Sequence, residues 1–340
     1  MSAHFRAVQV SEPGGDLVLT QIDAPEPGAG QVRVAVEACG ICHSDVPIIA
    51  GYLPGTTFPM TPGHEIADRV DAVGAGVEEW QEGDRVALGY IAGTCGHCDA
   101  CRDGDSINCP EAKTPGVSYP GGFADTVVVP ANGLSRIPEG LAAPDAAALA
   151  CAGLTAFNAF RNSAARPGDL VAVLGLGGVG HLGVQTAAAM GFVTVAIARG
   201  PQKAGPARDV GADHYIDSET QDVAQSLREL GGAKVILATA TSAEAISSAV
   251  GGLGRRGELI IVGLPQDNLT FGALDLIFGT KRVYGIISGT PLDREEAFRF
   301  AVSSGIRPWS EEVPLEDAAT AYARMLAGEA PFRMVLTAGR

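Results

Sequence analysis

Positive charge is scarce in this sequence of 340 residues. Lysine and arginine together number 24 against 39 aspartate and glutamate residues, which gives a formal net charge of −15. A chain this acidic repels phosphate backbones and anionic lipid surfaces. The charge balance therefore predicts that the protein binds neither nucleic acid nor a membrane.

A secretory signal is also missing from the first ten residues, MSAHFRAVQV, which have no basic cluster followed by an apolar run. Residues 170–198 carry no charge and are long enough to cross a bilayer. Six glycines interrupt this stretch, however, and it suits two buried parallel strands with a helix between them. The sequence therefore predicts a cytoplasmic protein.

Charged residues make up only 19% of the chain and hydrophobic residues 46%, which excludes disorder as a whole. The length suits two domains. Up to about residue 129, short apolar runs alternate with Gly, Pro and Asp turns, as in a β-rich domain. From residue 144 strands alternate with Ala-rich helical stretches, as in a parallel sheet. We expect an α/β protein with a β-rich domain over 1–150, completed by 289–340, and a doubly wound domain over 151–288.

The seven cysteines are an odd number, which argues against a disulfide framework. Four of them form a C-x2-C-x2-C-x7-C cluster within fifteen residues: Cys95, Cys98, Cys101 and Cys109. This density predicts a closed zinc site that ties down a loop. An iron–sulfur cluster is the alternative, but the ferredoxin pattern continues with x3-C-P, whereas seven residues separate the last two cysteines here.

A glycine-rich turn follows the apolar run 170–174. Gly175, Gly177 and Gly180 make a G-x-G-x-x-G pattern, and a helix-compatible run from 181 to 190 comes next. Between a strand and a helix, this pattern is typical of a dinucleotide-binding turn, in which the pyrophosphate lies at the helix N-terminus.

The choice of dinucleotide depends on the end of the following strand, where a carboxylate would bind the ribose 2′-hydroxyl of NAD. That end reads Ala198-Arg199-Gly200 and has no carboxylate. Arg199 could instead pair with a 2′-phosphate, so the sequence favours NADP over NAD.

The remaining cysteines are Cys39, Cys42 and Cys151, and His64 lies in a PGHE segment. A catalytic zinc needs three protein ligands and an open position. No local spacing identifies such a site, so these residues taken alone are only candidates.

Taken together, the motifs resemble those of the zinc-dependent medium-chain alcohol dehydrogenases, most closely the bacterial and cinnamyl-alcohol-dehydrogenase-like branch. The segments that carry the resemblance run in family order along the chain: GICHSD (40–45), PGHE (62–65), GDRV (83–86), the four-cysteine segment, CAGLT (151–155), GLGGVGHLG (175–183) and FRMVL (332–336). The resemblance implies a GroES-like catalytic domain and a Rossmann domain.

Ligands for two zinc ions per chain are implied by this resemblance. The catalytic ion would be held by Cys42, His64 and Cys151, with Glu65 as an alternative ligand and Asp45 orienting the imidazole. The four-cysteine cluster would hold the structural ion.

Contacts to cofactor and substrate are also implied. Ser44 would relay the alcohol proton, but Pro47 stands where a relay histidine is often found. Asp68 departs from the small residue that is usual after PGHEIA. Tyr52, Tyr90 and Leu264 fall near pocket positions. The expected dinucleotide contacts are His43, Thr155, Gly178, Val179, Ala198, Arg199 and Arg333, besides the three glycines of the turn.

The expected activity is hydride transfer between a primary or secondary, possibly aromatic, alcohol and NAD(P). Rival interpretations are a zinc-lacking quinone or enone reductase of the same superfamily, which would lack the ligand cysteines, and a non-catalytic dinucleotide sensor, which would not need an open zinc site. A zinc-ribbon nucleic-acid binder conflicts with the net charge. The resemblance implies a homo-oligomer, a tetramer rather than a dimer.

Overall fold

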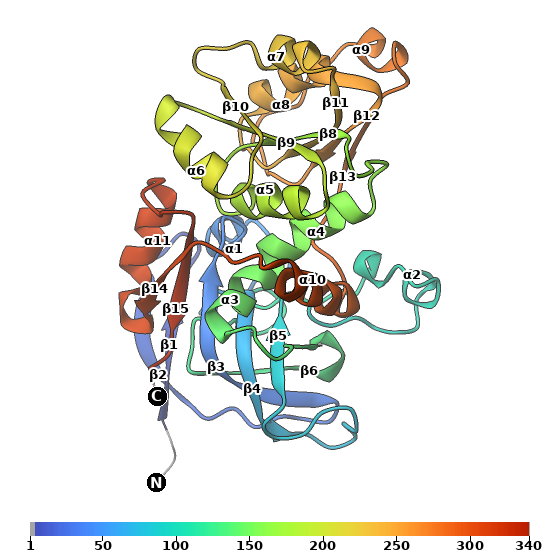
Figure 1. The fold of residues 1–340 in the computed structure, drawn as a ribbon. Coiled ribbons are helices and arrows are strands. Elements are labelled where there is room, and N and C mark those ends of the chain that lie inside the picture. The colour runs from blue at the N-terminus through green and yellow to red at the C-terminus, as the bar shows by residue number, and fades with distance from the viewer. Residues whose placement is uncertain (1–3, 340) are drawn as a thin grey trace. The chain divides into compact units, whose positions relative to one another are not determined.

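The computed structural model describes residues 4–339, which divide into two compact units (Figure 1). The first unit comprises residues up to 154 together with 288–302 and 308–339. The second comprises 155–287 and 303–307. The division therefore falls four residues after the expected boundary near 150 and leaves Cys151 in the first unit. Within the described residues, no helix is long and apolar enough to cross a bilayer.

The second unit is built on a parallel sheet with the strand order β10-β9-β8-β11-β12-β13. Its strands are β8 (Leu170–Leu174), β9 (Val193–Ala198), β10 (His214–Asp217), β11 (Ala233–Ala238), β12 (Leu253–Ile261) and β13 (Arg282–Gly285). The order reverses between β8 and β11, and a ligand binds in the crevice at such a point in this class of sheet.

Helices connect these strands: α5 (Gly180–Ala189), α6 (Ala204–Asp209), α7 (Val223–Glu229), α8 (Ala243–Ala249) and α9 (Ala273–Ile277). Because parallel crossovers are right-handed, α5 and α6 cover one face of the sheet and α7 and α8 the other (Figure 1). The strands are buried on both faces, which accounts for the uncharged stretch in the sequence.

The first unit contains a mixed sheet that follows the path β14-β15-β3-β4-β5-β7, with β6 paired to β3. Its strands are β3 (Gln31–Ile41), β4 (Glu65–Val73), β5 (Arg85–Leu88), β6 (Thr126–Pro130), β7 (Ser135–Arg136), β14 (Ser310–Pro314) and β15 (Arg333–Thr337). A separate antiparallel pair is formed by β1 (His4–Gln9) and β2 (Val18–Asp23). The last strand, β15, lies beside β3, so the C-terminal segment completes the first unit.

Short helices surround this sheet: α1 (Asp45–Ile49), α2 (Asp99–Arg102), α3 (Ala143–Ala148), α10 (Pro291–Ser304) and α11 (Ala318–Leu326). A π-helix, Leu149–Gly153, joins α3 directly to α4 (Leu154–Arg161). The helix expected over 315–326 starts with a 3₁₀ turn, Leu315–Asp317, before α11. The end of β3, the start of β4 and the π-helix thus lie close together.

Candidate metal centres and nucleotide turn

His64, just before β4, is fully buried and is fixed by a carboxylate. Its Nδ1 lies 2.9 Å from Oδ1 of Asp45, the first residue of α1. The second carboxylate oxygen accepts a hydrogen bond of 2.9 Å from the backbone N–H of Cys42, which follows β3. One carboxylate therefore orients both the imidazole ring and the turn that carries the cysteine. This is the arrangement by which an outer carboxylate fixes a metal-binding histidine.

Glu65 and Arg333 form a buried ion pair beside this histidine. Glu65 is the first residue of β4 and Arg333 the first of β15, and their exposed side-chain fractions are 0% and 4%. Nη2 of the arginine donates to Oε2 of the carboxylate. The arginine expected at the cofactor pyrophosphate thus has one nitrogen committed to the carboxylate next to the imidazole.

Cys151 lies in the π-helix between α3 and α4. A π-turn inserts one extra residue into a helix and often occurs at functional sites. The structure brings the Cys151 sulfur together with donor atoms of Cys42, His64 and Glu65, all within 4.8 Å of one another and all buried. We call these four residues the dispersed cluster.

The donor atoms of the dispersed cluster fit a zinc ion. His64 Nε2 and Glu65 Oε1 are buried and have no hydrogen-bond partner in the described structure. A buried polar atom without a partner is costly, and a bound cation would satisfy both atoms. Two sulfurs, one imidazole nitrogen and one carboxylate oxygen are all zinc ligands.

The pKa values within the cluster are strongly shifted. A hydrogen bond from Cys151 lowers the pKa of the Cys42 thiol well below its usual value, and the same contact raises the pKa of Cys151. Burial lowers the pKa of the His64 imidazole, but the charge and hydrogen bond of Asp45 together with Cys42 outweigh burial, so the net shift is upward. Burial raises the pKa of Glu65 to about 8, although Arg333 opposes the shift. The dispersed cluster thus holds several ionisable groups close together and away from solvent.

Other predicted residues of this region differ in their surroundings. The Tyr90 ring meets the His64 ring edge to face, with a centroid separation of 5.3 Å. Ser44 is half-buried at the start of α1, and His43 beside it is exposed. Tyr52 is 78% exposed, so only Tyr90 of the two predicted pocket tyrosines contacts a cluster residue.

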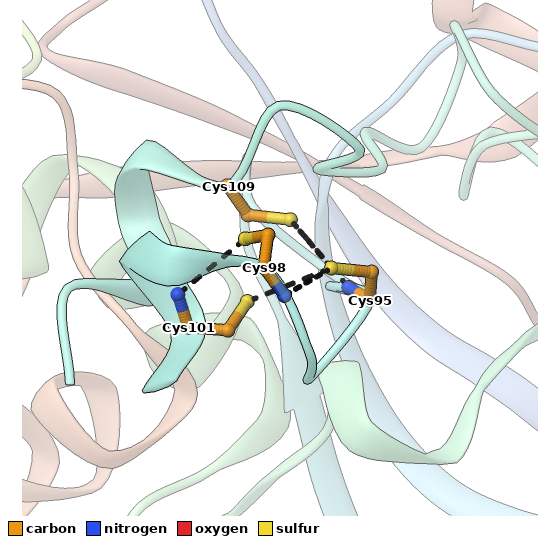
Figure 2. Close-up of side chains that lie close together, drawn as sticks. All are labelled: Cys95, Cys98, Cys101 and Cys109. Carbon is orange, nitrogen blue, oxygen red and sulfur yellow. Dashed lines mark hydrogen bonds between the residues drawn. The ribbon is translucent and has the colours of Figure 1, made fainter. Parts of the chain in front are cut away.

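The four-cysteine lobe, formed by Cys95, Cys98, Cys101 and Cys109, is a second group of converging sulfur atoms (Figure 2). Cys109 Sγ lies 3.6 Å and Cys101 Sγ 4.0 Å from Cys95 Sγ. Backbone N–H groups point at the sulfurs, such as Cys98 N at 3.4 Å from Cys95 Sγ. The N–H of Cys95 contributes most to lowering the pKa of Cys109, which falls to about 7. Four converging sulfurs, three of which accept a backbone N–H hydrogen bond, suit a closed tetrahedral zinc site.

The glycine-rich turn between β8 and α5 needs its glycines for different reasons. A Cβ at Gly180 would lie 1.8 Å from the Gly175 carbonyl oxygen, and Gly175 has a φ of +104°. These two glycines are therefore required by the fold itself. A Cβ at Gly177, in contrast, would meet nothing within 4 Å. The open space over Gly177 is what a pyrophosphate would need for close approach.

The end of β9 presents Arg199 on the surface. The carboxylate in register with this strand end is Asp217 of β10, opposite Ala198. Asp217 is buried and accepts a hydrogen bond of 2.8 Å from the Gly200 N–H. The Tyr215 hydroxyl lies 2.6 Å from the Gly200 carbonyl oxygen. Tyr215 and Asp217 therefore brace the turn that carries Arg199.

These bracing residues and the Glu65–Arg333 pair are absent from the expectations drawn from the sequence. The strand 214–217 ends in an acidic residue, which is the one local signal for Asp217. No local pattern links Glu65 with Arg333, since 268 positions separate them. Only the pairing of β15 with β3, and of β3 with β4, brings the two residues together.

Family models match both parts of the chain. Residues 28–139 match the alcohol dehydrogenase GroES-like domain, and residues 178–303 match the zinc-binding dehydrogenase model. The alcohol dehydrogenase notN of Aspergillus sp. (strain MF297-2) is 42% identical over 321 residues, with 94% of each chain covered. An alcohol dehydrogenase of Geobacillus stearothermophilus is 34% identical over 334 residues, which are 98% of this chain and 99% of the relative.

Solved structures are similar along the whole length. A cinnamyl alcohol dehydrogenase from Sorghum bicolor has a TM-score of 0.90 at 29% identity and covers 98% of both chains. A Helicobacter pylori CAD complexed with NADP(H) has a TM-score of 0.87 at 25% identity, with 99% of both chains covered. An acetophenone reductase from Geotrichum candidum NBRC 4597 in complex with NAD has a TM-score of 0.85 at 28% identity, with 99% and 98% covered.

Proposed function

Since this chain belongs to the zinc-type medium-chain alcohol dehydrogenases, we propose that its dispersed cluster is the catalytic centre. The protein is an oxidoreductase that interconverts alcohols and carbonyl compounds with zinc and NAD(P). Cys42, His64 and Cys151 hold the catalytic zinc, and Glu65 is an alternative ligand. The observation that carries this assignment is the buried, unpartnered Nε2 of His64 in a group whose donor atoms, two sulfurs among them, lie within 4.8 Å of one another.

When bound, zinc supplies Lewis-acid polarisation of the substrate oxygen. The residues of the chain do the rest. Asp45 holds the imidazole through Nδ1, so Nε2 is left for the metal. Arg333 pairs with Glu65 and opposes the rise that burial causes in the pKa of this carboxyl group. Ser44, next to Cys42, offers a hydroxyl that takes the proton of the alcohol. Pro47 has no proton to exchange, so Ser44 passes a proton on to water or to another group.

The preferred dinucleotide is NADP. Arg199 is exposed at the end of β9, where a 2′-phosphate would lie, and the neighbouring Asp217 is occupied by backbone N–H groups. The strand end thus offers a cation and no available carboxylate. The further cofactor contacts are the glycine turn with Gly178 and Val179, then His43, Ala198, Thr155 and Arg333.

The four-cysteine lobe holds a second, structural zinc. All four ligand positions are filled by sulfur, so no position is left for a substrate. This ion shapes the segment around α2 and takes no part in the chemistry.

The substrate is a primary or secondary alcohol or the corresponding carbonyl compound, with aromatic examples included. The packing of the Tyr90 ring against the His64 ring supports an apolar pocket wall at the metal. Ser44 leaves more room there than a threonine would, although one methyl is worth only about 1 kcal/mol.

The chain assembles as a homo-oligomer. In the second unit β13 is an edge strand, and α9 just before it exposes Leu274 and Ile277, each by more than 60%. An uncovered apolar surface beside a sheet edge favours a second copy. A tetramer, rather than a dimer, follows from the resemblance to bacterial members. A cytoplasmic location is supported by the seven unpaired thiols.

The proposal is tested by the initial rate of benzaldehyde reduction with NADPH and with NADH at matched concentrations. We expect faster turnover with NADPH. Arg199→Asp should reduce the NADPH rate roughly 10- to 100-fold, because a charge-assisted hydrogen bond to the 2′-phosphate is lost. Arg208→Asp, at another exposed arginine of the same unit, should leave the ratio unchanged.

Two other outcomes would change the assignment. Faster turnover with NADH would overturn the role of Arg199 while leaving the reaction class intact. A complete lack of turnover with either dinucleotide, across aromatic and aliphatic substrates, would contradict the catalytic assignment of the dispersed cluster.

A further inference from the structure

Arg294, in α10, is a fully buried arginine to which the proposed reaction assigns no role. Its sequence surroundings, PLDREEAF, are those of a solvated helix face. The structure instead places its guanidinium inside the first unit, with 0% exposure. Among residues 4–339, its hydrogen bonds go to carbonyls and a hydroxyl, and none goes to a carboxylate. Burial of an arginine without a carboxylate is costly, so its position needs a specific reason.

The guanidinium donates to three backbone carbonyls and one hydroxyl. Nε lies 3.2 Å from Ala150 O, Nη2 3.1 Å from Ile91 O, and Nη1 3.4 Å from Gly133 O and 2.8 Å from the Ser135 hydroxyl. These acceptors come from three separate segments of the first unit. The planar fork of an arginine can hold several acceptors in one fixed geometry, which lysine cannot do.

Two of the three carbonyls belong to segments that carry residues of the catalytic centre. Ala150 directly precedes the ligand Cys151 in the π-helix. Ile91 directly follows Tyr90, whose ring meets the His64 imidazole. The same guanidinium therefore connects the π-helix that carries Cys151 to the loop that packs on His64.

Gly89 leaves the room that this contact needs. A Cβ at Gly89 would lie 2.5 Å from Ala150 O and 2.8 Å from Nη2 of Arg294. Any larger residue would push the arginine and the carbonyl away together. The glycine, the arginine and the cysteine turn thus form one close-packed unit.

Further hydrogen bonds hold α10 in place around Arg294. The Ser135 hydroxyl donates to Pro291 O at 2.8 Å, and Arg136 N donates to Glu295 at 2.9 Å. These bonds hold α10 on β7 on both sides of Arg294.

Burial lowers the pKa of Arg294 to about 10, and a Cys151 thiolate opposes this shift more than any other group. The guanidinium therefore stays cationic at neutral pH.

We propose that Arg294 is a positioning residue of the catalytic metal centre. By fixing the Ala150 and Ile91 carbonyls, it sets where the Cys151 sulfur and the Tyr90 ring lie relative to His64. It also places a buried positive charge near the side chain of Cys151. This inference rests on the proposed function, in which Cys151 is a zinc ligand.

The test measures zinc per chain during titration of the purified holoenzyme with a chelator, together with the visible spectrum of the cobalt-substituted protein. Arg294→Met should lose one of two zinc ions at a chelator concentration about 10- to 100-fold lower than wild type, as for other outer residues of metal sites. The cobalt bands should shift because the sulfur has moved. Arg294→Lys keeps the charge without the fork and should shift the same bands by less.

Matched controls separate positioning from general destabilisation. Arg85 donates to two other carbonyls, Pro138 and Leu141, so Arg85→Met and Arg85→Lys should retain both ions as wild type does. Gly89→Ala should reproduce the Arg294→Met result, even where Arg294→Met itself fails to fold. Gly205→Ala, where a Cβ meets nothing within 4 Å, is its control.

The outcomes distinguish this inference from the function beneath it. If wild type holds two zinc ions, and Arg294→Lys and Gly89→Ala keep both ions with unchanged chelator sensitivity and cobalt spectra, the positioning role is wrong. If wild type holds only the zinc of the four-cysteine lobe, the proposed function fails and this inference fails with it.

Discussion

The four-cysteine lobe and the dispersed cluster hold the same kind of donor atoms but are built in opposite ways. The lobe takes all its sulfurs from one segment, 95–109, and backbone N–H groups of that segment point at three of them. The dispersed cluster takes its donors from β4, the π-helix and the turn after β3, and depends on Asp45 for orientation. A site made of one segment is closed and supports the fold. A site assembled from several elements can leave a position open for a substrate.

The contrast predicts different consequences when each site is damaged. Loss of a contact around the dispersed cluster should lower turnover and zinc affinity. The stability of the fold should change little, because the surrounding strands still hold it together. Loss of a contact in the lobe should cost stability and little chemistry.

Asp45→Asn should produce the larger effect on the catalytic centre. The amide can still bond one neighbour, but it loses the charge that holds the His64 ring and the Cys42 N–H together. We expect zinc affinity of this site, or turnover, to fall about 10- to 100-fold. Chelator titration with turnover as the second readout measures this. Asp71→Asn, which weakens a half-exposed pair with Arg33, is the control. Equal effects of the two variants would contradict the orienting role.

Cys98→Ser should have the smaller effect on turnover. The substitution removes one of four sulfurs and weakens zinc binding in the lobe, so the melting temperature should fall by several degrees. Turnover per folded chain should stay within about twofold of wild type. Cys39→Ala removes a buried thiol outside both clusters and gives the effect of a plain thiol loss. A large loss of turnover in folded Cys98→Ser protein would show that the lobe is not merely structural.

Predictability from the sequence follows the same contrast. The lobe can be predicted from the sequence because its four cysteines share one short segment. The glycine turn can be predicted because a strand and a helix flank it. The parallel strands are legible because both of their faces are buried, which leaves uncharged runs. The proposed ligands Cys42, His64 and Cys151 stand 22 and 87 positions apart, so only the family resemblance connected them.

The roles of Arg294 and of the Glu65–Arg333 pair could not be predicted from local sequence patterns, for a physical reason. Arg294 sits among acidic residues that are typical of a solvated helix, and burial of its side chain depends on carbonyls from three distant segments. The pairing of Glu65 with Arg333 requires strands β4, β3 and β15 to be adjacent. Such contacts are set by tertiary packing, which spacing along one chain does not encode.

The most direct test of two zinc sites with separate roles is the zinc content of Cys42→Ser, measured with its turnover and melting temperature. We expect one zinc per chain, a melting temperature close to that of wild type, and turnover reduced at least about 1000-fold, since several kcal/mol of transition-state stabilisation are lost. Two zinc ions per chain with turnover within tenfold of wild type would contradict it.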